Sequence, residues 1–326
     1  MRNSAQVIVP LTVALAAAIP ASAVRAGDWP ERPVRLIVAY PAGGATDGAA
    51  RILAERLSTA WGQPVVVENR PGAAGRIGVA LAAKSPHSYT FVAATNSTIN
   101  EQLTRSEDGA PPPAAELQPV STIFTTPVAL LVNRQAAPVD DLAQYIALAR
   151  GKPGAVSYGS SGEGTVTHFF GELLKREERI DVIHIPFAGE GPNLSGLVGG
   201  HVTSAFLSAS GAIKAGQTGK TRALAVTTPA GSALLPGVPS FAQLGITGLD
   251  RDSWVGLFAP VGTPQTVLDR AAQDIAAVLA SEDVRQRYTQ LGLMAEGDTP
   301  EDLARRVEDD REYWGRIVRQ TGIVLR

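Results

Sequence analysis

The chain of 326 residues contains no cysteine. This absence excludes disulfide bonds, cysteine nucleophiles, thiolate metal sites and the lipid-modified cysteine of a lipoprotein. It suits an oxidising compartment, in which an unpaired thiol is a liability. Aromatic residues are also scarce, at 6%, whereas glycine (33) and proline (23) are abundant. This balance favours many short elements joined by tight turns over a helical bundle.

The chain also lacks an excess of charge of one sign, because its 29 basic residues nearly balance its 31 acidic residues. The basic residues are scattered, so no nucleic-acid partner is expected. The N-terminal apolar run, residues 7–19, is too short for a membrane helix; it follows Arg2 and precedes small-residue cleavage sites ending at Ala23 and Ala26. We interpret residues 1–26 as a signal peptide and expect a soluble, exported mature protein.

Strand-like and helical patterns alternate along the chain, which predicts an α/β fold. The β-prone run Val34–Tyr40 breaks at Pro41–Gly44, and a helix capped by Thr46 or Asp47 should follow. About 300 mature residues favour two domains. Because residues 125–132 and 248–257 look like crossings between them, we expect a two-lobed fold in which each lobe is a mostly parallel sheet flanked by helices. The expected boundaries are 27–126 with 252–326 for a discontinuous lobe 1, and 127–251 for lobe 2.

The usual catalytic motifs are missing. The four histidines lack metal-ligand spacing, Gly219-Lys220-Thr221 lacks the first glycine of a P-loop, and no serine stands in a Gly-x-Ser-x-Gly frame. We therefore expect no catalytic residue, no metal and no cofactor. A serine hydrolase built on Ser161 and His168 is kept as an alternative hypothesis.

Glycine-rich or hydroxyl-rich loops follow several predicted strands. Amides at the start of a helix attract carboxylates without a fixed cation, and ligands of open α/β sheets lie at the carboxyl ends of strands. Each loop alone could be ordinary turn chemistry, but loops on both lobes predict an anion site between them. The candidate ligand-binding residues are Tyr40, Ala42, Gly43, Gly44, Thr46, Asp47, Asn96, Ser97, Ser161, Gly162, Gly164, Thr165, His168, Phe187 and Gly189.

Roles within this set differ. Tyr40 and Phe187 are the expected apolar walls. Asp47 is either a helix cap or an acid that acts on a bound carboxylate through water. His168 is either a surface residue or a ligand contact, and His184, inside an apolar strand, is expected to be a core histidine.

Motifs along the mature chain resemble one known family. They are Trp29–Val38, Pro41–Asp47, Gly62–Gly75, Tyr158–Thr165 with His168, Pro186–Gly189, Leu224–Thr227, Leu234–Pro239 and Trp254–Pro260. Together they resemble the Bug (TctC-like) solute receptors of tripartite tricarboxylate transporters. The resemblance implies a type II Venus-flytrap fold and a small carboxylated solute held between the lobes. It also implies that residues 42–47 contact one carboxylate partly through water.

The same resemblance implies a monomeric protein of the Gram-negative periplasm whose partners are the membrane permease subunits. A protein that presents its ligand to a membrane sensor kinase is the alternative. Two departures from the family pattern bear on the ligand. Phe187 replaces a common tyrosine, and Gly199–Leu207 lacks two usual aspartates, which favours a more apolar or differently charged ligand.

Overall fold

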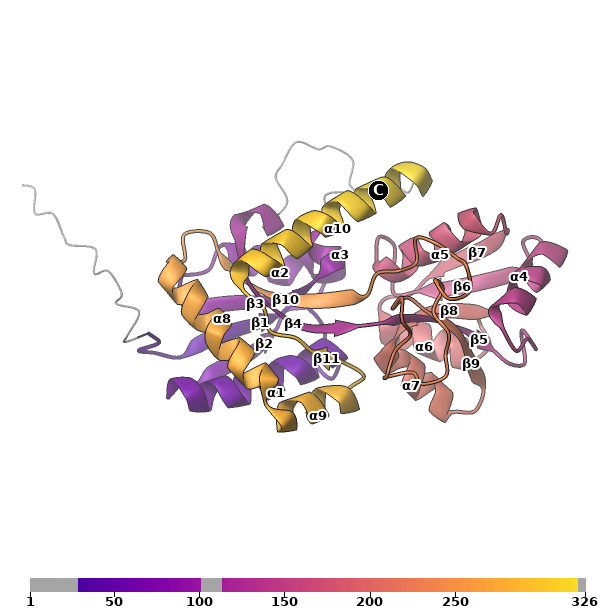
Figure 1. Ribbon diagram of the computed structural model, residues 1–326. Coiled ribbons are helices and arrows are strands. Elements are labelled where there is room, and N and C mark those ends of the chain that lie inside the picture. Colours follow the sequence, from indigo (N-terminus) through magenta and orange to yellow (C-terminus); the bar gives the residue numbers. More distant parts are fainter. Residues whose placement is uncertain (1–28, 101–112, 322–326) are drawn as a thin grey trace, which may run out of the picture.

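The computed structural model describes residues 29–100 and 113–321. The expected signal peptide lies outside these ranges. Two sheets, each covered by helices, form two bodies side by side (Figure 1). We call the first sheet with its helices lobe 1 and the second sheet with its helices lobe 2.

Lobe 1 contains a six-stranded sheet. Its strands, in spatial order, are β11 (Met294–Ala295), β4 (Leu117–Thr126), β10 (Ser253–Pro260), β3 (Thr90–Thr95), β1 (Val34–Val38) and β2 (Val65–Asn69). The sheet of lobe 2 has five strands. They are β7 (Val182–Pro186), β6 (Val156–Ser160), β8 (Ser204–Ser208), β5 (Val128–Asn133) and β9 (Thr221–Val226).

Helices occupy both faces of each sheet. Their bounds are α1 (Ala45–Trp61), α2 (Arg76–Ala83), α3 (Asn96–Ile99), α4 (Leu142–Gly151), α5 (Val166–Glu177), α6 (Glu190–Val198), α7 (Ala209–Gln217), α8 (Gln265–Ala280), α9 (Glu282–Gln290) and α10 (Pro300–Thr321), with short 3-10 helices at η1 (Ala73–Gly75) and η3 (Pro113–Glu116). Asn96 and Ser97, expected in a loop after a strand, lie instead in the short helix α3.

Burial on both faces explains the uninterrupted apolar strands of lobe 1. Along β1, Leu36 and Val38 pack against α1, α8 and α9, whereas Ile37 and the following Ala39 pack against α2, α3 and α10. Successive side chains of a strand point to opposite faces, so a strand covered on both sides is apolar throughout. In lobe 2, α4 and α5 cover one face and α6 and α7 cover the other.

The two-lobed α/β fold is confirmed, but its sheets are mixed rather than mostly parallel. Among the strands of the described residues, the parallel pairs are β1 with β2 and β3, and β6 with β7 and β8. The pairings of β4, β5, β9, β10 and β11 are antiparallel. The reason is that β4 and β5 are joined through the first crossing and β10 begins in the second, so each sheet contains strands that run to or from the other lobe.

The crossings also place the same edge of each sheet, the edge where its parallel strands end, at the junction between the lobes. Val38, at the end of β1, pairs with Asn69 and Ala93, and β4 ends at this same edge because Thr126 pairs with Ser253. After Pro127, β5 enters the second sheet opposite the end of β8, where β6 and β7 also end. The carboxyl ends of the parallel strands of both lobes therefore meet at the junction.

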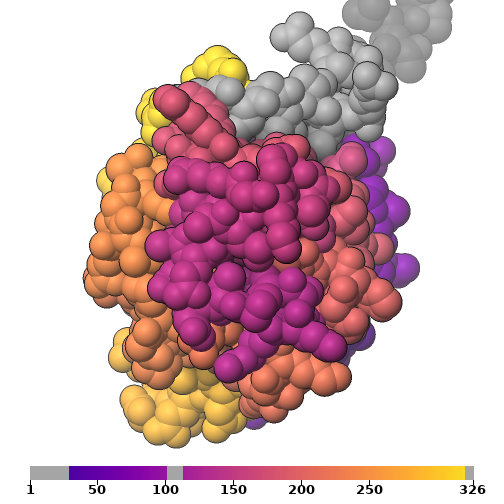
Figure 2. Space-filling view, turned by 90° about the vertical axis from the view of Figure 1, so that its right-hand side faces the viewer, coloured from indigo at the N-terminus to yellow at the C-terminus, as the bar shows by residue number. Residues whose placement is uncertain are grey.

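Helix α10 makes a third connection, which the sequence did not indicate. It begins on lobe 1, where Leu303 and Val307 are buried, and ends in the core of lobe 2. There Trp314 lies 5.4 Å, centroid to centroid, from Phe169 and from Phe170. Figure 1 shows this yellow helix running along lobe 1, with its C-terminal end reaching the near edge of lobe 2. Seen from the lobe 2 end, the magenta segment around α4 forms the outer face, turned away from lobe 1 (Figure 2).

Candidate functional site

The start of α1 is the richest group of free amides at the facing edge of lobe 1. Its N-cap is Gly44, with φ −77° and ψ 170° and no side-chain cap, so the expectation that Thr46 or Asp47 caps the helix is wrong. The first bond of the helix joins Gly48 N–H to Gly44 O, 3.0 Å. Among the described residues, no partner accepts a hydrogen bond from the amides of Gly44, Ala45, Thr46 or Asp47. Such amides at a helix start favour an anion.

Asp47 acts inside this loop as its anchor. Its carboxylate accepts the Gly43 N–H at 2.9 Å, the Asn69 Nδ2 at 2.8 Å and the Arg51 Nε at 3.1 Å. Burial raises its pKa, but the hydrogen bonds from Arg51, Gly43 and Asn69 and the charge of Arg51 outweigh burial, so the pKa of Asp47 is lowered. The carboxylate is therefore ionised and fixes the bend at Pro41–Gly44, which leaves Ala42, Gly43 and Gly44 exposed.

Tyr40 closes the other side of this bend. Its hydroxyl donates to Thr95 Oγ1 at 2.8 Å, lies 2.8 Å from Thr98 Oγ1 and accepts the Thr95 N–H at 2.8 Å. Burial raises its pKa further than these hydrogen bonds lower it. The ring is half-buried, so Tyr40 offers an apolar ring face while its hydroxyl is fully engaged within lobe 1.

The glycine-rich loop of lobe 2 is shorter than expected, because β6 continues through Gly159 and Ser160. Most of its amides are used internally. Ser161 N–H donates to Thr167 Oγ1 at 2.9 Å, and Gly164 N–H donates to His168 Nδ1 at 3.1 Å. Thr165 hydroxyl donates to Gly162 O at 2.7 Å. The lobe 2 loop therefore differs from the lobe 1 loop, in which the amides from Gly44 to Asp47 have no partner among the described residues.

His168 and His184 form a stacked pair behind that loop. Their ring centroids are 4.1 Å apart, and His184 Nε2 lies 2.7 Å from Ser160 Oγ. Burial lowers the pKa of His168, and burial together with the charge of His168 lowers the pKa of His184 to about 4. His168 is buried, so its reading as a surface residue is wrong, and His184 is half-buried rather than in the core. Because His168 Nδ1 accepts the Gly164 N–H, that nitrogen is not available to activate Ser161.

Phe187 and Gly189 connect β7 to α6. The Phe187 ring packs beneath α6 so closely that a Cβ at Gly196 would lie 2.4 Å from its Cζ. Gly189, with φ 112°, is the N-cap of α6 and takes a conformation that favours glycine. Phe187 is half-buried, so part of the ring remains available as an apolar wall.

Helix α3 joins the two lobes directly. Ser97 Oγ accepts the Val166 N–H, 3.2 Å, at the first residue of α5. The adjacent Asn96 donates from Nδ2 to Asp310 on α10, 3.4 Å, and Asp310 accepts the Trp254 Nε1–H at 2.8 Å. Burial raises the pKa of Asp310, with Trp254 and Asn96 opposing the rise. Two candidates from sequence, Asn96 and Ser97, thus lie at the contact between the lobes.

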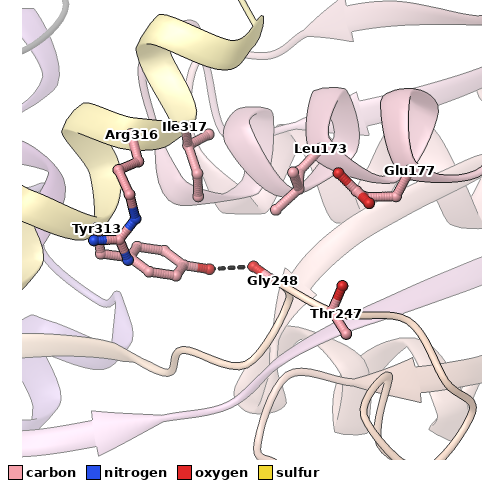
Figure 3. A pocket seen from close by; sticks show the side chains of 7 residues that line it. All are labelled: Leu173, Glu177, Thr247, Gly248, Tyr313, Arg316 and Ile317. Atoms are coloured by element: carbon pink, nitrogen blue, oxygen red, sulfur yellow. Dashed lines mark hydrogen bonds between the residues drawn. The ribbon is translucent and has the colours of Figure 1, made fainter.

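A cavity of about 240 Å³ lies elsewhere, at the seam between α5 and α10 (Figure 3). Leu173, Ile317 and Tyr313 form its apolar part, and Tyr313 hydroxyl donates to Gly248 O. Leu173 is two turns beyond the start of α5, so this cavity is separate from the glycine-rich loops. The sequence candidates do not line it.

Sequence reasoning missed two residues of the facing edges. Asn69 donates to Asp47 Oδ1 and to Tyr40 O, at 2.8 Å and 3.1 Å. Glu190 Oε1 accepts from the Ser208 hydroxyl at 2.6 Å. Both could have been found, since each is a polar residue at the end of a predicted strand or in the glycine-rich turn that follows one.

Within the described residues, no group of three or more potential ligands could hold a metal ion. Over the same ranges, no helix has the length and apolar character needed to cross a membrane.

Comparison with known proteins gives consistent matches. Residues 49–323 match the model of the "Tripartite tricarboxylate transporter family receptor". The chain is 31% identical to protein BugT of Bordetella pertussis over 326 residues, covering 99% of this chain and 100% of that one. It is similar to Rpa4515 of R. palustris, solved with adipate (TM-score 0.84, 32% identity, 91% and 99% of the chains covered). It is also similar to MatC of Rhodopseudomonas palustris, solved with bound malate (TM-score 0.79, 28% identity, 89% and 100% covered).

Proposed function

The chain belongs to the tripartite tricarboxylate transporter receptor family, and from that premise we propose that it captures a small organic acid between its lobes in the periplasm and delivers it to the membrane permease of such a transporter. The signal-peptide pattern of residues 1–26 supports the location. The neighbours solved with adipate and malate support a carboxylate ligand.

One observation carries the proposal: the four unpartnered amides at the start of α1. They stand at the edge of lobe 1 that faces lobe 2, and the macrodipole of a 17-residue helix adds partial positive charge there. Asp47 is the nearest acid, yet its charge is already balanced by Arg51, Asn69 and Gly43. A ligand carboxylate can therefore bind at this helix start, with Ala42, Gly43, Gly44 and Thr46 around it.

The crossing segments supply a hinge for closure around the ligand. Thr227 N–H donates to Val128 O at 2.9 Å, and Val128 N–H donates to Thr227 Oγ1 at 3.0 Å. Asp252 Oδ1 accepts from the hydroxyls of Thr227 and Thr228, at 3.1 Å and 2.8 Å. These bonds hold the two crossings together, which supports lobe boundaries at 126/127 and 251/252. A ligand that binds the closed arrangement better than the open one shifts the population toward closure.

Delivery requires that the closed, loaded form be recognised by a membrane partner. In the described structure Ser97 of lobe 1 accepts a hydrogen bond from the first amide of α5 in lobe 2, so both lobes contribute to one surface there. We propose that the permease reads this surface.

The test measures binding of small organic acids by thermal unfolding and calorimetry. A ligand present at 100 times its dissociation constant should add about 2.7 kcal/mol to the free energy of unfolding. Ala45→Pro removes one amide at the first position of α1, where proline fits and Gly44 already has an extended ψ of 170°. Loss of one hydrogen bond to a charged group should weaken carboxylate binding by about tenfold or more.

Gln265→Pro is the matched control. Gln265 is exposed and is the first residue of α8, preceded by Pro264 with ψ 140°. That helix follows the opposite end of β10, away from the facing edges. The control should leave affinity unchanged. Equal losses in the two variants, or no stabilisation by any acid, would contradict the proposal.

A further inference from the structure

Lobe 2 has an acid, Glu190, at the edge that faces lobe 1. A second carboxylate of a ligand at this edge would instead need hydrogen-bond donors such as amides. Glu190 is in the first turn of α6, directly after the turn at Gly189. Its Oε1 accepts both the Ser208 hydroxyl, 2.6 Å, and the Ser208 N–H, 3.2 Å. Ser208 is the last residue of β8 and the N-cap of α7. The carboxylate of Glu190 therefore occupies the start of a neighbouring helix.

The residues around the Glu190 carboxylate leave space for it. A Cβ at Gly211, in the first turn of α7, would lie 2.3 Å from Glu190 Oε1, so only glycine at 211 leaves room for it. Burial raises the pKa of Glu190, while Ser208 and the charge of Lys214 act to lower it. No hydrogen bond to Oε2 is found within the described residues. The second oxygen of Glu190 therefore remains available as an acceptor.

The location faces lobe 1. Ser208 pairs with Val128, the first residue of β5 and part of the first crossing. Gly292 of lobe 1 lies against α7, since a Cβ at Gly292 would be 2.6 Å from Ser210 Cα. Thr126 hydroxyl, at the end of β4, donates to Gly292 O at 3.1 Å. Glu190 thus belongs to the part of lobe 2 that closes onto lobe 1.

Other amides at the helix starts of lobe 2 are partly taken up by the protein itself. Ser97 accepts the Val166 N–H at the start of α5, and Pro127 O accepts the Ala209 N–H at the start of α7, 2.9 Å. In α6, Pro192 has no N–H to offer, which leaves the amides of Glu190 and Gly191 without an acceptor among the described residues. Within the described residues, lobe 1 keeps four successive free amides, whereas lobe 2 offers the half-buried acid Glu190.

We propose that Glu190 is a specificity-determining residue that selects acids with one carboxylate and, at the far end, a hydrogen-bond donor such as an ammonium or hydroxyl group. The inference rests on the proposed function, because the single carboxylate is taken to bind at the start of α1. A ligand with a second carboxylate places like charges together beside Glu190, and such repulsion between desolvated groups is an effective way to reject a competitor. A ligand with a hydrogen-bond donor at the same point instead donates to Glu190 Oε2.

The experiment compares ligands matched in length, at pH 8 to favour the ionised carboxylate. The first set is adipate, 6-aminohexanoate, 6-hydroxyhexanoate and hexanoate; the second is succinate, 4-aminobutanoate, 4-hydroxybutanoate and butanoate. In the wild type, the amino or hydroxy acid of at least one set should bind about tenfold or more tightly than the dicarboxylate of that set. Glu190→Gln should narrow or reverse that ratio by about tenfold or more.

Two further variants guard the interpretation. Glu190→Asp keeps the charge and should keep the discrimination against dicarboxylates. Glu177→Gln removes an exposed acid three turns along α5 and should change no ratio. Two results would overturn this inference but leave the proposed function standing. They are tighter binding of the dicarboxylate by the wild type, and an affinity ratio between the matched ligands that does not change in Glu190→Gln. Failure of every acid to bind overturns the proposed function and this inference with it. If Glu190→Gln does not fold, the wild-type ranking decides.

Discussion

Replacing Asp47 by asparagine should destabilise lobe 1 and loosen the loop that precedes α1. Asp47 is only 4% exposed, and its two oxygens accept hydrogen bonds from Gly43, Asn69 and Arg51. The amide of asparagine has one acceptor oxygen, and its NH₂ group would face donors. A hydrogen bond to a charged group contributes about 1.5–3 kcal/mol. Arg51 is 53% exposed, which reduces its share. The expected loss is therefore about 2–4 kcal/mol at pH 7.

The pH dependence gives a second, independent check. The folded pKa of Asp47 is lowered, so its contribution is complete above the unfolded value of about 3.9 and is lost as the pH falls through the folded value. The difference between wild type and Asp47→Asn should therefore be constant from pH 7 to about pH 5 and shrink below about pH 4. Urea unfolding followed by circular dichroism measures it.

Asp302→Asn is the matched control. Asp302 is a surface acid that accepts a hydrogen bond from Thr299, just before α10, and pairs with Arg305 in the second turn of that helix. Exposed pairs of this kind contribute little to stability, so Asp302→Asn should change the free energy of unfolding much less than Asp47→Asn does. A loss below about 1 kcal/mol for Asp47→Asn, or a loss that does not shrink in acid, would refute the view that the ionised carboxylate anchors the loop.

Two other predictions follow from the interior. Trp314→Ala should lower the free energy of unfolding by about 3–5 kcal/mol, because this 3% exposed ring of α10 packs against Phe169 and Phe170 of the other lobe. Urea unfolding measures the change. A loss of less than about 1 kcal/mol would show that α10 does not tie the lobes together. The second concerns His184, whose folded pKa, about 4, lies below the unfolded value of about 6.5. The unfolded state binds the proton first, so the free energy of unfolding should fall as the pH drops from about 6.5 to about 4, and His184→Gln should reduce that slope. An identical slope in the variant would assign the acid sensitivity to other groups.

Local sequence patterns were enough to predict many strands, loop breaks and helix caps of this protein, and its family. The run from Val34 to Val38 could be predicted as a strand because both of its faces are apolar, and the break at Pro41–Gly44 followed from proline and glycine chemistry. The position of Asp141 as an N-cap was equally readable, since its carboxylate accepts the Gln144 N–H at 2.8 Å. The family could be recognised because its motifs are short, contiguous and carried in order.

Only tertiary structure decided which polar groups are free. The amides at Ser161 and Gly164 looked as available as those at Ala45 and Thr46, but Thr167 and His168, one turn into the next helix, take them up. The lobe-spanning path of α10 and the acid at Glu190 depend on contacts between residues far apart in sequence. Periodicity reports which face of an element is buried, but not what buries it, so the sequence determined the elements and loops while packing determined which loop can hold an anion.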